Sequence, residues 1–204
     1  MDSLGFAVLR LPPHLAYSRA RANALYQTLR PPGDSLCYYF DNTKILFASD
    51  HARENKDACR ICDEVDLPFF RDMCEYALRT CRAVAALDGR GHQDRVELTV
   101  RALSGTPVVL ETGAITKSTQ MWHIDNAYLT LSVPLLGPST EVLPNVHAYA
   151  DLPRGEDQTP VHIVPGLALC MTGAHRTLHN VPTMHRAPPT RERRLTALAF
   201  YYLN

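Results

Sequence analysis

The segment MWHIDNAYLTLSVPL, residues 121–135, places a histidine and an aspartate two positions apart within a run of apolar and β-branched residues. Successive side chains of a β-strand point to opposite faces, so we expect His123 and Asp125 on one face and Trp122 and Ile124 on the other. An imidazole and a carboxylate on one rigid strand supply two of the three protein ligands of a metal site with open positions. The segment therefore predicts a strand that carries part of a metal site.

A second His-x-Asp pair, His92 and Asp94, stands in a different context. It lies in the stretch LDGRGHQDRVEL, residues 87–98, which is rich in glycine and polar residues. Such a stretch is typical of a solvated turn, in which neither side chain has a fixed direction. We therefore assign the candidate metal site to the first pair.

The spacing of apolar residues changes along the chain from a helical to an alternating pattern. Residues 14–30 and 67–87 carry apolar side chains at helical spacing, and the second range predicts the principal helix. A short strand is expected before the first helix, and residues 37–57 predict a strand followed by an exposed loop.

Beyond the principal helix, short β-rich runs are separated by Gly, Pro, Asn and Ser turns. This order of elements predicts an α+β chain whose C-terminal part is a jelly-roll or barrel. The expected strands lie in residues 96–103, 106–112, 122–135, 139–150, 161–172 and 193–203.

Length and composition indicate a single domain. A chain of 204 residues with 46% hydrophobic residues can bury one sizeable core, and no internal repeat or long linker interrupts it. We expect one domain over residues 1–204. In it, a mainly helical segment with a few strands, 1–95, precedes a β-rich core, 96–204.

The net charge and hydropathy of the chain argue against two classes of binding partner, nucleic acids and membranes. The formal net charge of zero provides no long-range attraction to nucleic acid or to an anionic membrane. No apolar run approaches the roughly 18 residues that span a bilayer. The N-terminal stretch MDSLGFAVLRL carries an acid where a signal peptide has basic residues. We therefore predict a cytoplasmic protein that binds neither membranes nor nucleic acid.

The six cysteines are too sparse for a disulfide scaffold and suit a reducing compartment. Cys59 and Cys62 form a Cys-x-x-Cys pair, but a structural zinc site needs a second pair at short spacing. Cys74 and Cys81 are seven residues apart on the predicted principal helix, which is too far for one clamp. Buried or free thiols are expected, and the role of Cys59 and Cys62 stays open.

Towards the C-terminus, the sequence offers a third metal ligand and a basic residue at a set distance from it. His185 follows the pair His123 and Asp125 by about sixty residues, and Arg194 comes nine residues later in the β-rich run RRLTALAF. The stretches HID and HRAPPTRERRLTALAFYY, with their order and spacing, resemble the Fe(II)- and 2-oxoglutarate-dependent oxygenases. The resemblance covers roughly residues 120–204.

The resemblance implies a fold, a site and a reaction. The fold would be a double-stranded β-helix, which is a jelly-roll of the cupin kind, with bracing helices before it. His123, Asp125 and His185 would bind Fe(II), while Arg194 and the hydroxyl of Thr196 would hold the distal carboxylate of 2-oxoglutarate. The protein would be a dioxygenase that uses O2 to hydroxylate its substrate and releases succinate and CO2.

The chemistry favours the same residues. Two imidazoles and one carboxylate on one face of Fe(II) leave three positions for a bidentate 2-oxo acid and for oxygen. A buried carboxylate is costly unless it is paired, and a planar arginine is its fitting partner. Strand alternation places Arg194, Thr196 and Leu198 on one face and turns Arg193 outward.

His179 competes with His185 for the role of third ligand. We prefer His185 because the ninth residue after it is an arginine in a strand, whereas the ninth residue after His179 is Pro188. The remaining arginines of the stretch, Arg186 among them, are expected to be solvated.

The substrate is expected to be a small molecule, and a protein side chain stays an alternative. Two other functions also stay open. One is a metal-dependent cupin-type dioxygenase or isomerase that does not use 2-oxoglutarate, and the other is a non-catalytic jelly-roll module that binds a ligand. Residues 37–57 are a candidate for the lid of the pocket.

Overall fold

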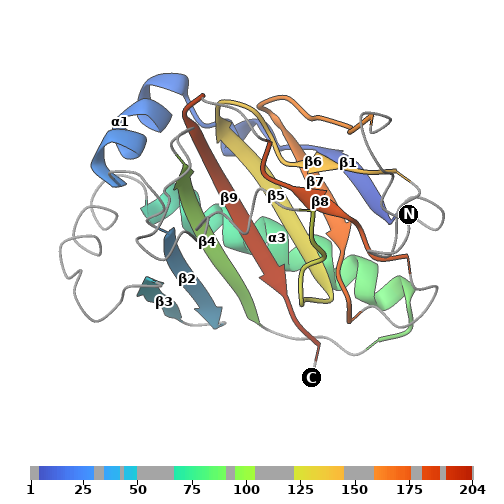
Figure 1. Ribbon diagram of the computed structural model, residues 1–204. Helices are drawn as coiled ribbons and strands as arrows, with labels where there is room; N and C mark the ends of the chain where they lie inside the picture. The colour runs from blue at the N-terminus through green and yellow to red at the C-terminus, as the bar shows by residue number, and fades with distance from the viewer. Residues whose placement is uncertain are drawn as a thin grey trace, which may run out of the picture.

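The structure is a computed structural model, and it describes residues 5–29, 35–41, 44–49, 67–90, 95–103, 122–144, 159–175, 181–188 and 192–203. In these ranges a large antiparallel sheet lies between helices on one face and a small two-stranded sheet on the other (Figure 1). The elements in chain order are β1 (Phe6–Arg10), η1 (Pro13–Leu15), α1 (Arg19–Leu29), β2 (Ser35–Asp41), β3 (Lys44–Ser49), α3 (Leu67–Leu87), β4 (Arg95–Leu103), β5 (Leu129–Leu136), β6 (Glu141–Val142), β7 (Leu167–Thr172), β8 (His185–Arg186) and β9 (Arg194–Tyr201).

The large sheet has the strand order β1-β7-β5-β9-β4-β2-β3, and its neighbours are antiparallel. The small sheet consists of β6 and β8. Strands β1, β2 and β3 come from the first half of the chain and join the sheet that the second half builds. The predicted α+β character is therefore present, with a mostly antiparallel sheet and few helices in the described ranges.

The two faces of the large sheet differ in character because side chains alternate along each strand. In β9, Leu195, Ala197 and Ala199 are buried in the main apolar core, which α1 and α3 also line. Arg194 and Thr196 face the opposite side and line a pocket. This division places the helices behind the sheet and leaves its other face for the small sheet.

The principal helix has the predicted bounds. Phe70, Met73, Cys74, Ala77 and Cys81 recur at helical spacing and are fully buried, so α3 lies across the sheet along one apolar stripe (Figure 1). Among the described helices, none combines the length and apolar composition that a membrane-spanning helix needs.

The first helix begins later than expected. Ser18 caps it, because its hydroxyl accepts a hydrogen bond from the Arg21 backbone N–H at 3.2 Å and its carbonyl accepts one from the Ala22 N–H. Leu15, which fits the helical spacing in the sequence, lies in the preceding 3-10 turn instead.

The strand expected over residues 122–135 is shorter than predicted. It begins at Leu129, and His123 takes part in a single β-bridge. The cause is tertiary, because the carbonyl groups of Asp125 and Tyr128 accept hydrogen bonds from the backbone that follows β7. The expectation that one strand carries both His123 and Asp125 is therefore wrong.

Other strand boundaries also differ. Residues 37–57 supply part of a hairpin, β2 and β3, instead of one strand followed by a loop, and residues 50–57 lie outside the described ranges. The run 139–150 contributes two residues to β6, and its last six residues are not described. In the run 161–172, the strand begins at Leu167.

Gly137 is required where β5 ends beside β9. Its φ is +71°, and a Cβ atom there would lie 2.0 Å from the carbonyl oxygen of Arg193. Gly89, after α3, also has a positive φ, of +67°, but no atom of the described residues lies within 4 Å of a Cβ placed there. The two glycines thus share a backbone conformation and differ in the space around them.

We expect Gly137→Ala to lower the free energy of unfolding by about 3 kcal/mol or more, since backbone strain and a clash with Arg193 add together. Gly89→Ala should cost about 1 kcal/mol, from the backbone alone. Denaturant unfolding of the two variants beside the parent measures the difference. Equal losses would show that the close approach at Gly137 does not matter.

Candidate metal centre and its pocket

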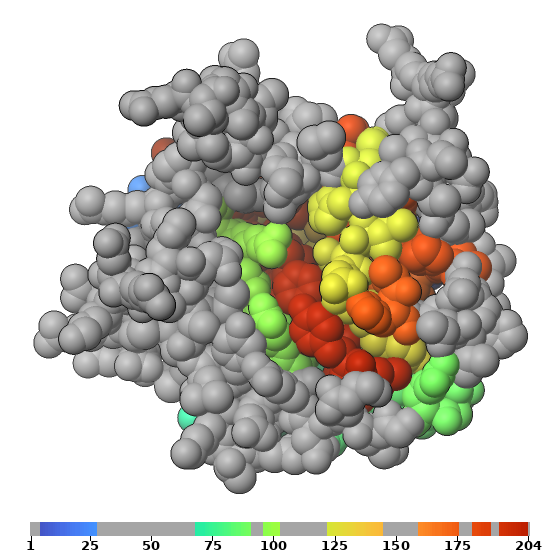
Figure 2. Space-filling model, turned by 60° about the horizontal axis from the view of Figure 1, so that its bottom comes forward, coloured from blue at the N-terminus to red at the C-terminus, as the bar shows by residue number. Residues whose placement is uncertain are grey.

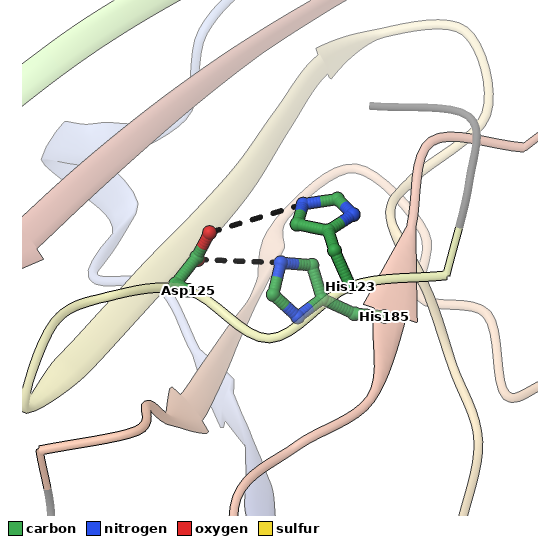
Figure 3. A group of neighbouring side chains, drawn as sticks. All are labelled: His123, Asp125 and His185. Carbon is green, nitrogen blue, oxygen red and sulfur yellow. Dashed lines mark ion pairs between the residues drawn. The ribbon is translucent and has the colours of Figure 1, made fainter. Parts of the chain in front are cut away.

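Three side chains that could ligate a metal ion meet beside the small sheet, those of His123, Asp125 and His185 (Figure 3). One ligand atom from each can be chosen so that all three lie within 4.8 Å of one another. Nε2 of His123 lies 3.8 Å from Oδ1 of Asp125, and Nε2 of His185 lies 3.2 Å from Oδ2. Two neutral imidazoles and one carboxylate that approach a metal ion from the same side form a facial donor set.

The two histidines are held together by the backbone. The N–H of each donates to the carbonyl of the other at 2.9 Å, which forms an antiparallel bridge between segments about sixty residues apart. Their rings consequently lie side by side, with 4.3 Å between the ring centroids. The spacing of the two candidate ligands is thus fixed by main-chain geometry.

The orientation of the His185 ring is set by a hydrogen bond. Its Nδ1 lies 3.0 Å from the carbonyl oxygen of Thr183, and a carbonyl can only accept, so Nδ1 carries the proton. In the neutral ring, Nε2 then presents its lone pair towards Asp125. A buried imidazole held in this way is typical of a metal ligand.

Asp125 is held as an anion. Thr130, in β5, donates its hydroxyl hydrogen to Oδ2 of Asp125 at 2.7 Å. Burial alone raises the pKa of Asp125, but attraction to the imidazolium form of His185, hydrogen bonds from that form and from Thr130, and attraction to His123 outweigh it and lower the pKa to about 2. The carboxylate is therefore ionised at neutral pH and available to a cation.

A pocket joins these three side chains to the inner face of β9. Figure 2 shows a hollow on this face, in which β4 (green), β9 (red) and the segment that contains β5 (yellow) come together. The residues that line the pocket are Arg101, His123, Asp125, Thr140, His185, Arg186, Ala187, Arg194, Thr196 and Leu198.

Arg194 is buried at one end of this pocket. Its guanidinium donates to the carbonyl of Pro138 at 3.0 Å and to the hydroxyl of Thr140 at 2.8 Å, and Thr140 in turn lies 2.8 Å from the hydroxyl of Ser132. Burial and the nearby Arg101 lower the pKa of Arg194 to about 10, against the opposing effect of Glu141. The group is still a cation at neutral pH, held in place by neutral oxygens.

Thr196 has an unused hydroxyl. Its Oγ1 is buried and has no hydrogen-bond partner among the described residues. A buried polar atom without a partner costs about 1–3 kcal/mol, so natural structures rarely retain one without a reason. Because the hydroxyl lines the pocket beside Arg194, a ligand oxygen in the pocket would satisfy it.

The structure brings together all five residues singled out in the sequence, while their roles stay predictions. Arg193 is exposed on the opposite side, as alternation predicts, with its Cζ atom 5.7 Å from the centre of the Tyr26 ring. The competing residues His179, His92, Asp94, Cys59 and Cys62 lie outside the described ranges.

Two arginines of the pocket were missed in the sequence. Arg186 was expected to be solvated, but it is half-buried, pairs with Glu141 at 2.6 Å and lies over the ring of Trp122 at 4.2 Å. Arg101 received no role. The alternation in VELTVRAL puts Arg101 on the face opposite Val100 and Ala102, which was the available signal.

Comparisons with known proteins bear on the fold. No protein-family model and no curated protein match the sequence. The solved structures that resemble this one include a dioxygenase, a prolyl-4-hydroxylase and a protein in complex with alpha-KG. The rice dioxygenase for auxin oxidation has a TM-score of 0.55 and 17% identity, over 98% of this chain and 74% of its own.

Two further solved structures resemble this one to a similar degree. A full-length Neurospora crassa protein, in complex with alpha-KG and 5-formyluracil, has a TM-score of 0.60 and 13% identity, over 100% of this chain and 76% of its own. Pseudomonas putida prolyl-4-hydroxylase has a TM-score of 0.53 and 12% identity, over 99% of this chain and 94% of its own. At such identities the likeness concerns the fold, and the resemblance inferred from the sequence is confirmed at that level.

If the three side chains hold a metal ion, Thr130→Val should weaken binding about 10- to 100-fold, because it removes the hydrogen bond that orients Asp125. Ser132→Ala is the matched control, since this neighbour on β5 bonds to Thr140 and not to the three ligands. Calorimetric titration of the metal-free protein with Mn(II) measures both. An equal effect of the two substitutions would contradict this assignment.

Proposed function

We propose that this protein is an Fe(II)- and 2-oxoglutarate-dependent oxygenase built on a double-stranded β-helix. The observation that carries the proposal is one pocket in which a His-Asp-His cluster, a buried arginine and an unpartnered hydroxyl meet. Each of these features is common alone. Together they provide ligands for one metal ion and a cation and a hydroxyl for one dicarboxylate.

The path of the chain supports this fold. Single bridges extend the small sheet, because His123 pairs with His185 of β8 and Val161 pairs with Val142 of β6. From β4 onward, the described chain runs alternately through the large and the small sheet: β4, His123, β5, β6 with Val161, β7, β8 and β9. Repeated crossing between two facing antiparallel sheets is how a jelly-roll is wound.

The donor set fits Fe(II). His123, Asp125 and His185 would hold the ion through two imidazole nitrogens and one carboxylate oxygen, a set that leaves coordination positions open. Bound there, Fe(II) would supply the electrons that activate O2. Thr130 and the carbonyl of Thr183 would keep two of the ligands oriented.

The other end of the pocket fits the distal carboxylate of 2-oxoglutarate. Arg194 offers a planar cation whose hydrogen bonds in the described structure go to neutral oxygens, so its positive charge is not compensated by a direct carboxylate partner. Thr196 adds a hydroxyl that has no hydrogen-bond partner in the described ranges. One carboxylate would neutralise the charge and satisfy the hydroxyl together.

The reaction we propose converts a C–H bond of the substrate into C–OH. One oxygen atom of O2 enters the product and the other enters succinate, while the carboxyl carbon next to the keto group of 2-oxoglutarate leaves as CO2. A small-molecule substrate is favoured, because the formal net charge of zero provides no long-range attraction to nucleic acid.

The proposed function is tested by loading the protein with Fe(II) and 2-oxoglutarate without oxygen and recording the visible spectrum. A weak metal-to-ligand charge-transfer band is expected, followed by succinate release when oxygen and a metabolite extract are added. A metabolite whose mass rises by one oxygen in step with succinate identifies the substrate. A band that never forms would overturn the proposal, and metal binding without it would favour a cupin-type enzyme.

The two His-x-Asp pairs provide the control for this test. Asp125→Ala removes an anionic ligand, so iron affinity and succinate release should fall by two orders of magnitude or more. Removing only a group that orients a ligand typically costs about 10- to 100-fold, and loss of the ligand itself should cost at least as much. Asp94→Ala should alter neither. Equal iron loss from both variants would mean that the wrong pair was chosen.

Thr196→Val should separate stability from binding. It removes an unpartnered hydroxyl, so the ligand-free protein should melt at the same or a higher temperature, while 2-oxoglutarate binds about tenfold more weakly. Thr172→Val is the counterpart, because that hydroxyl donates to the Gly5 carbonyl at 2.8 Å. It should lower stability by about 1 kcal/mol and leave 2-oxoglutarate affinity unchanged. The opposite pattern would remove Thr196 from the site.

A further inference from the structure

Arg101 is a charged pocket residue to which the proposed cosubstrate site gives no role. It lies in β4, directly opposite Thr196 of β9 in the strand register. Its neighbours Val100 and Ala102 are fully buried in the core on the helix side. Arg101 therefore points to the other face of the sheet, where it lines the pocket.

The guanidinium of Arg101 has no carboxylate partner in the described part of the chain. Its recorded side-chain contact there is with the ring of Phe200, whose centre lies 5.9 Å from Cζ. By contrast, Arg186 is paired with Glu141. Arg101 also contributes to the lowered pKa of Arg194, so the two cations are close enough to repel each other.

The direction of Arg101 separates it from the distal carboxylate site. Along β9, Phe200 lies six residues beyond Arg194, which corresponds to about 20 Å of extended strand. The end of β9 near Phe200 adjoins the segment that carries Asp125, because Tyr201 pairs with Leu129. Arg101 therefore extends from its place opposite Thr196 towards the end of β9 that adjoins the segment of Asp125.

The charges of the filled pocket point to a second anion. Arg101, Arg186 and Arg194 contribute three positive charges, and Fe(II) would add two. Asp125 and Glu141 contribute two negative charges, and 2-oxoglutarate would add two more. Among the described residues, one positive charge then stays uncompensated, and a partly buried cation without a partner is costly.

We infer that Arg101 binds a carboxylate of the molecule that is oxidised, so that the substrate is a small carboxylic acid. This inference rests on the proposed function and names its substrate class. The two N–H groups of a guanidinium edge match the two oxygens of a carboxylate, which fixes the orientation as well as the charge of the bound acid. Leu198 and Ala187, which line the same pocket, offer apolar surface for its hydrocarbon part.

The inference is tested by binding in the full protein loaded with Fe(II) and 2-oxoglutarate in the absence of oxygen. The probes are matched pairs of an acid and its neutral amide, hexanoate with hexanamide and 3-phenylpropanoate with 3-phenylpropanamide. Calorimetry should show each acid binding about tenfold or more tightly than its amide. Arg101→Gln should abolish this preference, and Arg101→Lys should retain part of it.

Arg193→Gln is the matched control, because it removes the same charge from an exposed position next to β9. It should leave the preference for acids intact. The dissociation constant of 2-oxoglutarate should stay within about threefold of the parent in Arg101→Gln, since Arg194 holds that carboxylate.

The outcomes distinguish the two levels of the proposal. Equal binding of acids and amides by the parent protein, or no binding of any probe, would overturn the role of Arg101 while the charge-transfer band upholds the oxygenase. Loss of 2-oxoglutarate affinity in Arg101→Gln would reassign Arg101 to the cosubstrate. Failure of the parent to bind 2-oxoglutarate would overturn the proposed function, and this inference with it.

Discussion

The site depends on a pair of backbone hydrogen bonds between His123 and His185. On its other side, the strand of His185 pairs with Val142, so the small sheet is tied to the segment that leads into β5. Val142 packs with Leu169 and Met171 of β7, which fixes the small sheet over the large one. Because the main chains of the two segments are paired and the two sheets are packed together, the distance between the two imidazoles is fixed.

β9 serves the core and the pocket at the same time. Leu195 and Ala197 pack with the helices. Arg194 and Thr196 present a cation and a hydroxyl, which has no partner among the described residues, to the pocket on the other face. Polar groups held this way are unfavourable to folding on their own. The apolar face of the same strand offsets that cost and holds the polar face rigid, which is what a ligand that must be oriented requires.

The sequence predicts helices and strands whose apolar pattern repeats over many residues. It does not predict elements whose ends are set by contacts with distant parts of the chain. The 21 residues of α3 repeat their apolar stripe often enough to define both ends, and alternation along β9 assigns the faces of Arg194 and Thr196. By contrast, β8 has two residues, too few for any period. The late start of β5 reflects backbone bonds to the chain after β7, which no local pattern records. Arg101 was overlooked because alternation divides the faces of a strand without telling which one is lined by a pocket.

The position of Trp122 gives the protein a built-in optical reporter. It is the single tryptophan of the chain and directly precedes His123. Its indole ring lies 4.2 Å from the guanidinium carbon of Arg186, which lines the pocket. Indole emission is sensitive to nearby charge and to paramagnetic ions, and the intrinsic tryptophan fluorescence of this protein comes from one known place, beside His123 and the pocket. Filling of the pocket is therefore open to observation in the unlabelled, unmodified chain.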